Sequence, residues 1–231
     1  MSVNPTAHRS LSEQAYELIR QKIVTLALPP SSVVDEGQLQ EELNLGRTPI
    51  REALKRLELE RLVNIIPRRG IFVTPINLTD LQRLYEMRLE LECMATKLAT
   101  TRGTANHWQE MEYVLKQAYP PGNISPEQLI AIDDQCHRII YKAADNQFLE
   151  QTLMALYPLS LRMWNVALDK LGDNKEKVVK HEHIVEHEQI MAALREGAAT
   201  EAVALMHGHI AAYQQYIENA ILGKSAQLLP T

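Results

Sequence analysis

Residues 46–73 read GRTPIREALKRLELERLVNIIPRRGIFV, and they decide the fold of the first third of the chain. Thr48 is a favourable helix N-cap and Pro49 suits the first helical position, so a helix is expected to begin here. Arg51 and Lys55 fall on a face that stays available to a partner. The apolar residues recur at helical spacing and predict a buried stripe of Ile50, Ala53, Leu54 and Leu57.

After this helix the pattern changes to two short β-type runs. The runs 62–66 and 71–74 flank the sequence PRRG, which is typical of a turn. This arrangement predicts a two-stranded wing with Arg68, Arg69 and Gly70 at its tip.

Positive charge gathers in the same stretch. Residues 47–69 hold seven Lys/Arg and three Asp/Glu, a net charge of +4, in a chain whose formal net charge is −5. Arg47 and Arg51 lie near the positive end of the helix dipole, which is unfavourable until a polyanion binds. A solvated amphipathic helix and hairpin would explain a charge cluster alone. Here the helix start, one helix face and the wing are all basic, as a protein that reads the major groove and anchors on phosphates requires.

This stretch resembles the GntR family of bacterial transcription regulators, whose winged helix carries a pattern close to SRTPVREAL-x-RLE-x-EGLV followed by PRRG-x-x-V. The resemblance implies that Arg47 and Arg51 contact bases or phosphates and that Thr48 contacts a phosphate. It also implies that the wing enters the minor groove. The expected DNA-binding residues are Arg47, Thr48, Arg51, Lys55, Arg68, Arg69 and Gly70.

Two positions depart from the family pattern. Gly46 stands where Ser or Thr is usual, which removes a hydroxyl that could contact a phosphate. Arg61 stands where Gly is usual, which adds charge at the base of the wing.

The whole chain has 231 residues, enough for two modest domains with cores of their own. No apolar run approaches the length that spans a bilayer and no signal-peptide pattern is present, so a cytoplasmic protein without a membrane partner is expected. Cys93 and Cys136 lie in helical patterns outside C-x-x-C spacing and are expected to be buried thiols. The net charge is +1 over residues 1–76 and −6 over 77–231, which assigns any nucleic-acid binding to the first third.

The order of elements predicts a mainly α protein. Helical patterns at 10–28 and 35–43 precede the basic helix, and the wing follows it, which is the winged helix-turn-helix layout. A connector at 75–78 leads to a helix expected at 80–101, with Thr79 as its cap. Further helices are expected at 105–117, 125–146, 147–171, 175–195 and 200–222.

The absence of an alternating strand pattern after Thr74 makes the second domain an all-α helical bundle. The expected division is a DNA-binding domain at 1–76 and an effector-binding domain at 77–231.

One aspartate and three histidines are expected to face the core of the bundle. Asp133 and His137 are four residues apart and share a helix face. His187 and His209 lie on apolar stripes of two helices and are equidistant from Ala198, so a helical hairpin that turns there brings them level.

These four residues favour a site for a divalent transition metal such as Zn, Ni, Mn or Fe. The alternative is that each is a hydrogen-bonded core side chain. His207 falls on the polar side of its helix and is expected at the surface. His183 is one turn from His187 and is the histidine most easily mistaken for a ligand.

The second half resembles the FCD effector domain that follows FadR-type winged helices. Its metal-binding pattern is D-x-x-x-H, then E-H, then M-x-x-H, and the corresponding residues here are Asp133, His137, Glu186, His187, Met206 and His209. Tyr85, Glu86, Arg88 and Glu92 match a YE-x-R-x-x-x-E segment, and the resemblance implies that Arg88 helps to bind an acidic effector. Alternatively, Arg88 pairs with a neighbouring Glu or extends to solvent. Cys136 stands where the family usually has Phe.

The sequence therefore predicts a metal-dependent transcription regulator that binds a palindromic operator in double-stranded DNA as a homodimer and senses a small carboxylate. A metalloenzyme fused to a DNA-binding module is the main alternative. It would need an open metal position and a general base, for which the sequence offers no obvious residue. An architectural DNA-binding protein would leave the inward-facing histidines unexplained.

Overall fold

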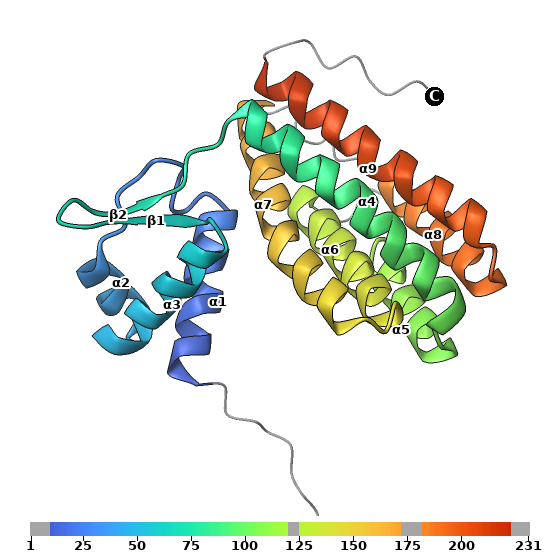
Figure 1. The fold of residues 1–231 in the computed structure, drawn as a ribbon, viewed down its shortest axis with the longest axis horizontal. Coiled ribbons are helices and arrows are strands. Elements are labelled where there is room, and N and C mark those ends of the chain that lie inside the picture. Colours follow the sequence, from blue (N-terminus) through green and yellow to red (C-terminus); the bar gives the residue numbers. More distant parts are fainter. Residues whose placement is uncertain (1–9, 120–124, 172–181, 223–231) are drawn as a thin grey trace, which may run out of the picture. The chain divides into compact units, whose positions relative to one another are not determined.

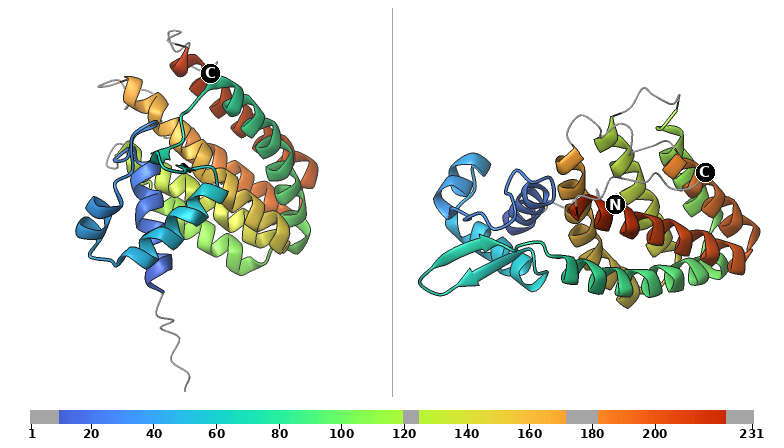
Figure 2. Two further views of the ribbon diagram at one scale, coloured as in Figure 1. Left: turned by 60° about the vertical axis from the view of Figure 1, so that its left-hand side comes forward. Right: turned by 90° about the horizontal axis from the view of Figure 1, so that it is seen from above.

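The computed structural model describes residues 10–119, 125–171 and 182–222 (Figure 1, Figure 2). The chain folds into two compact units, Met1–Ile76 and Asn77–Thr231. The predicted fold class is confirmed, because three helices and a two-stranded wing precede a helical bundle.

The first unit is a winged helix-turn-helix. Its strands are antiparallel, with Val63 opposite Val73 and Ile66 opposite Gly70. An isolated bridge between Val33 and Phe72 joins the segment before the second helix to the wing. The elements are α1 (Leu11–Val24), α2 (Glu36–Leu43), α3 (Arg47–Leu59), β1 (Val63–Ile66) and β2 (Gly70–Val73).

The core of this unit forms between α1 and α3. The predicted stripe of α3 is buried throughout, and Ile50 and Leu57 are fully inaccessible. Opposite it, Ile19 and Ile23 of α1 are also fully buried. Each such side chain contributes about 1.5–3 kcal/mol on burial, so this contact fixes the orientation of α3.

The start of α3 differs from the prediction. The helix begins at Arg47 and its N-cap is Gly46, so Thr48 is not the cap. Asn44 adopts a left-handed conformation (φ 52°) that ends α2, and α3 begins only three residues later. Pro49 still lies in the first turn, where a missing N–H breaks no intrahelical hydrogen bond. Similarly, α1 ends before 28, because Leu26 has φ 64°.

The second unit is a bundle, and its described residues contain no strand. In Figures 1 and 2, α4 runs alongside α9. The helices are α4 (Leu78–Arg102), α5 (Ala105–Lys116), α6 (Pro126–Ala143), α7 (Gln147–Leu171), α8 (Glu182–Glu196) and α9 (Ala199–Ile221).

The ends of these helices confirm one predicted cap and correct another. Ser125 and Gln128 form the predicted capping box of α6. The cap of α4 is Asn77 and not Thr79, because the Asn77 side chain accepts a hydrogen bond from the Asp80 N–H at 2.8 Å. The expected helix at 175–195 is described from Glu182 onward, and its earlier part lies outside the described residues.

The turn between α8 and α9 lies where the sequence places it. Gly197 has φ 72°, a left-handed conformation that glycine adopts without a steric penalty. The N–H of Ala198 donates to the carbonyl of Ala193 at 2.9 Å and so closes α8. This short hairpin brings the middle of α8 beside the middle of α9.

Candidate metal centre and DNA-binding surface

Four side chains from three helices converge in the bundle. Asp133 and His137 come from α6, His187 from α8 and His209 from α9. All four are buried, and one ligand atom from each lies within 4.8 Å of the other three. The turn at Gly197 makes His187 and His209 neighbours, with ring centroids 4.5 Å apart.

The separations between these atoms fit a bound metal ion. Asp133 Oδ1 lies 3.6 Å from His187 Nε2, 3.5 Å from His209 Nε2 and 3.9 Å from His137 Nε2. Metal bonds of about 2.0–2.2 Å put tetrahedral ligand atoms about 3.3–3.6 Å apart. Asp133 Oδ1 and His187 Nε2 are buried and have no hydrogen-bond partner among the described residues. A cation between them would satisfy both atoms.

Each imidazole is held through its other nitrogen. Nδ1 of His209 donates to Oε2 of Glu186 at 2.7 Å, and Nδ1 of His187 donates to the carbonyl of His183 at 2.9 Å. Nδ1 of His137 lies at an ion-pair distance of 2.6 Å from Oε2 of Glu92, although the geometry of this contact is not that of a hydrogen bond. With the proton of each ring on Nδ1, the Nε2 lone pairs of the three histidines would be free to bind a metal ion at the centre, as metal-binding histidines require.

The carboxylate of the cluster is oriented in the same manner. Oδ2 of Asp133 accepts a hydrogen bond from the Tyr157 hydroxyl at 2.5 Å, which leaves Oδ1 facing the imidazoles. The sequence identified the four converging residues but not the groups that orient them. Glu186 lies about 100° from His187 around α8. That offset is what lets it reach His209 on the neighbouring helix.

The electrostatics of the cluster attract positive charge to its centre. Burial lowers the pKa of His187 to about 3. Burial alone would also lower the pKa of His209, but the nearby carboxylates of Asp133 and Glu186 raise it to about 9. Burial would raise the pKa of Asp133, yet the surrounding imidazoles hold it well below its usual value. A cation bound here would take the place of protons.

A cavity adjoins the cluster. About 20 Å³ of it is accessible to the centre of a water molecule, which is room for roughly one water. Aromatic and polar side chains line it together with three members of the cluster. The lining includes Tyr85, Arg88, Asp133, His137, Tyr157, Ser160, Trp164, His209 and Tyr213.

Arg88 contributes positive charge to this cavity. It pairs with a neighbouring glutamate, which the sequence had offered as an alternative to a role in effector binding. It is 4% exposed, and its Nε donates to Oε1 of Glu92 at 2.6 Å. Its Nη1 contacts the hydroxyl of Ser160. Burial would lower the pKa of Arg88, but the charge of Glu92 raises it. Conversely, Arg88 and His137 lower the pKa of Glu92 to about 2 against the effect of burial.

Among the described residues, the other histidines and the cysteines stay outside the cluster. His207 is exposed, as predicted. His183 is partly buried, with Nδ1 3.6 Å from Glu186, and does not belong to the group of four. Cys136 is buried as expected, but Cys93 is only half-buried, with its Sγ 3.9 Å from the carbonyl oxygen of Val203.

The expected DNA-binding residues all lie at the surface of the first unit. Among them, Arg51 is engaged in a described ion pair, with Nε 2.8 Å from Oε1 of Glu36. Exposed pairs of this kind exchange readily, so Arg51 remains available. The exposed set is Arg47, Thr48, Arg51, Lys55, Arg68, Arg69 and Gly70.

Arg56 differs from its basic neighbours on α3. Its guanidinium lies 3.5 Å from the centre of the Tyr16 ring and pairs with Glu13 at 2.8 Å. Arg56 therefore contributes to the contact between α1 and α3.

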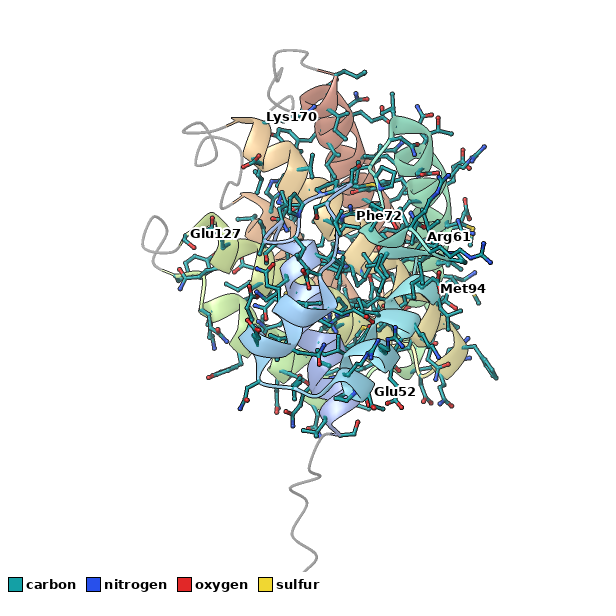
Figure 3. All side chains as sticks on the ribbon, turned by 90° about the vertical axis from the view of Figure 1, so that its left-hand side faces the viewer. Glu52, Arg61, Phe72, Met94, Glu127 and Lys170 are labelled. Carbon is teal, nitrogen blue, oxygen red and sulfur yellow. The ribbon has the colours of Figure 1, made fainter. Side chains whose placement is uncertain are left out.

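The backbone conformation at position 61 explains why the family usually has glycine there. Arg61 has φ 59°, a conformation that glycine adopts more easily than other residues. Its side chain is exposed (Figure 3). Arginine at this position therefore keeps a positive charge near the wing at some cost in backbone energy.

Comparison with protein families matches both units. Residues 11–73 match the family described as bacterial regulatory proteins, gntR family, and residues 83–212 match the FCD domain. The chain belongs to the GntR family and carries an FCD domain. As in other GntR regulators, its winged helix is a DNA-binding module. The buried cluster of Asp133 and three histidines in its FCD domain is consistent with a metal site.

Similar proteins with a described role are transcription regulators. The HTH-type transcriptional repressor RspR of Escherichia coli is 26% identical over 89% of this chain and 88% of its own length. The Nta operon transcriptional regulator of Aminobacter aminovorans is 25% identical over 86% and 90%. The solved structure of E. coli McbR/YncC covers 93% of this chain and 98% of its own, with a TM-score of 0.78 and 24% identity.

These relatives are regulators and not enzymes, so the metalloenzyme alternative is not supported and this GntR-family chain is a transcription regulator. Among the described residues, none of the helices is long and apolar enough to cross a bilayer.

Proposed function

We propose that this GntR-family regulator binds a palindromic operator as a homodimer, and that a divalent transition metal and a small carboxylate effector in the FCD domain control its affinity for DNA. The observation that carries the proposal is the convergence of one carboxylate oxygen and three imidazole Nε2 atoms within 4.8 Å, each with an orienting partner on the other side of its group. Apolar side chains would fill such a position at lower cost unless a ligand bound there.

Three imidazoles and one carboxylate suit Zn, Ni, Mn or Fe. Asp133 would supply the negative ligand and the histidines three neutral ones. The bound ion would supply positive charge and coordination positions for an oxygen ligand. Tyr157, Glu92 and Glu186 would keep the protein ligands in their orientations.

The same cavity supports a carboxylate as the effector. Arg88 and the cluster line one small space, so a carboxylate there would contact both the guanidinium and the metal. Because the space holds roughly one water, the effector would be small or the lining side chains would move as it enters. Ser160, which now accepts from Arg88, is the partner that a carboxylate would replace.

In the first unit, α3 would lie in the major groove and the wing against the minor groove. Arg47, Arg51 and Lys55 would face the groove, and Thr48 a phosphate. At the wing, Arg68, Arg69 and Gly70 would contact the minor groove and its phosphates.

Selection of binding sites from a random DNA library, with the purified full-length protein, tests the proposal. The expected product is a palindrome whose affinity differs between protein saturated with Zn²⁺ and protein treated with a chelator. A screen of small carboxylic acids on the same DNA would then identify acids that change this affinity. Selected sites without two-fold symmetry would contradict the proposal. So would a DNA affinity that is the same with Zn²⁺ and with the chelator.

A further inference from the structure

The helix that follows the first unit provides none of the four converging residues. Those residues come from α6, α8 and α9. Helix α4 begins at Leu78, directly after the end of the first unit at Ile76. Any effect of the cluster that passes along the chain to the winged helix must therefore reach α4 first.

Glu92 is the side chain of α4 that contacts the cluster. It is fully buried, and its two carboxylate oxygens have different partners. Oε2 lies 2.6 Å from Nδ1 of His137, and Oε1 accepts from Nε of Arg88 at 2.6 Å. One carboxylate thus joins a candidate metal ligand to the cationic side of the cavity.

Glu186 provides a natural comparison. Its Oε2 lies 2.7 Å from Nδ1 of His209, so it orients one imidazole much as Glu92 orients another. However, Glu186 belongs to α8, its side chain is 35% exposed, and its other described contact is His183 on the same helix. The two glutamates share one role toward the imidazoles, and only Glu92 connects that role to α4.

We propose that Glu92 is a positioning residue that transmits occupancy of the metal centre to α4. This inference rests on the proposed metal site. Coordination at Nε2 makes the Nδ1–H of an imidazole a stronger donor, so the contact between His137 and Glu92 tightens when the site is filled. Glu92 is fixed to α4 and also holds Arg88, so the tighter contact restrains the first half of α4 and the position of the guanidinium.

Glutamine at position 92 separates this role from simple packing. A carboxylate accepts hydrogen bonds at both oxygens, whereas an amide has one acceptor oxygen and one NH₂ donor. Glu92→Gln therefore cannot accept from both His137 and Arg88, although its size is unchanged. Glu186→Gln is the matched control, because it makes the same change beside His209.

Hydrogen exchange of backbone amides in the full-length protein tests the proposal, with Zn²⁺ as the probe. In the wild type, Zn²⁺ should slow exchange in peptides from residues 78–91 relative to a chelator. Both glutamine variants should bind Zn²⁺ about 10–100-fold more weakly. At saturating Zn²⁺, Glu186→Gln should recover the slowed exchange of α4, and Glu92→Gln should not.

A second variant guards against misfolding of Glu92→Gln, in which Arg88 loses its buried partner. Arg88→Met with Glu92→Gln removes both charges, and the bundle tolerates such paired replacement better than loss of one partner. It should bind Zn²⁺ without slowing exchange in α4. If α4 responds to Zn²⁺ equally in the Glu92 and Glu186 variants, Glu92 does not transmit occupancy. If the wild type binds no Zn²⁺, the proposed metal site fails as well.

Discussion

Replacing His209 by alanine should abolish the stabilisation of the FCD domain by metal, whereas replacing His207 should preserve it. Nε2 of His209 lies 3.3 Å from that of His137 and 3.5 Å from Oδ1 of Asp133, and its ring is buried. His207 is exposed, two residues earlier on the same helix. Both variants lose a histidine side chain from α9. They differ mainly in whether that side chain faces solvent or the metal site.

The expected size follows from mass action. A metal present at 100 times its Kd stabilises the folded state by about 2.7 kcal/mol. Because 1 kcal/mol shifts the Tm of a domain of 150–250 residues by about 2–4 °C, Zn²⁺ should raise the wild-type Tm by about 5–11 °C. His209→Ala also removes the closer of the two imidazole partners of Glu186 and so melts differently even without metal. The relevant quantity is therefore the difference between Zn²⁺ and chelator within each variant.

Circular dichroism melting, together with metal content by mass spectrometry, measures both quantities. We expect the wild type and His207→Ala to retain metal and to show the full shift, and His209→Ala to show neither. An equal Zn²⁺-induced shift in His209→Ala would refute the assignment of His209 as a ligand. Loss of metal in His207→Ala would show that the wrong face of α9 has been assigned to the metal site.

Three further predictions concern the winged helix. Arg51→Ala should weaken operator binding by about 1–3 kcal/mol per half-site in a fluorescence anisotropy titration. Arg56→Ala, whose side chain packs on Tyr16, should leave the affinity near wild type, and equal losses would contradict this distinction. Arg68→Ala should reduce the slope of log K against log salt by about 0.9 per protomer, and an unchanged slope would remove the wing tip from the DNA contact. Arg61→Gly should stabilise the first unit by about 0.5–1 kcal/mol in urea unfolding by relieving the positive φ, whereas Arg61→Ala should not, and a destabilised Arg61→Gly would contradict the strain.

The sequence was sufficient to bring the four cluster residues together because each lies on a strongly periodic helix. Spacing alone placed Asp133 beside His137. The turn at Gly197 then fixed the pairing of His187 with His209, since a tight hairpin leaves one register. Where two helices have a long apolar periodicity and a short turn joins them, the sequence alone determines which of their residues become neighbours.

Helix starts and the orienting partners were less accessible from sequence. Asn77 and Thr79 are both favourable caps, and the preference between cap residues amounts to only about 1 kcal/mol or less. The turn that ends α2 at Asn44, and not the capping preference of Gly46, determines where α3 begins. Glu92 reaches His137 because of how far α4 is shifted along its axis relative to α6. The periodicity of either helix does not specify that shift.

The charges around the cavity predict the sign of the coupling between metal and effector. Arg88 already balances Glu92, and Asp133 lies in the same buried space. A carboxylate that entered without a cation would place a further negative charge there, which low-dielectric surroundings oppose. With a divalent cation at the cluster, the same carboxylate would meet net positive charge. By linkage, an acid whose binding depends on the metal must strengthen metal binding by the same factor. The Kd for Zn²⁺, measured with an acid that changes DNA affinity, should therefore fall in the wild type and change less in Arg88→Met. A rise in the wild-type Kd for Zn²⁺ when the acid is added would mean that the acid competes for the metal instead of joining it in the cavity.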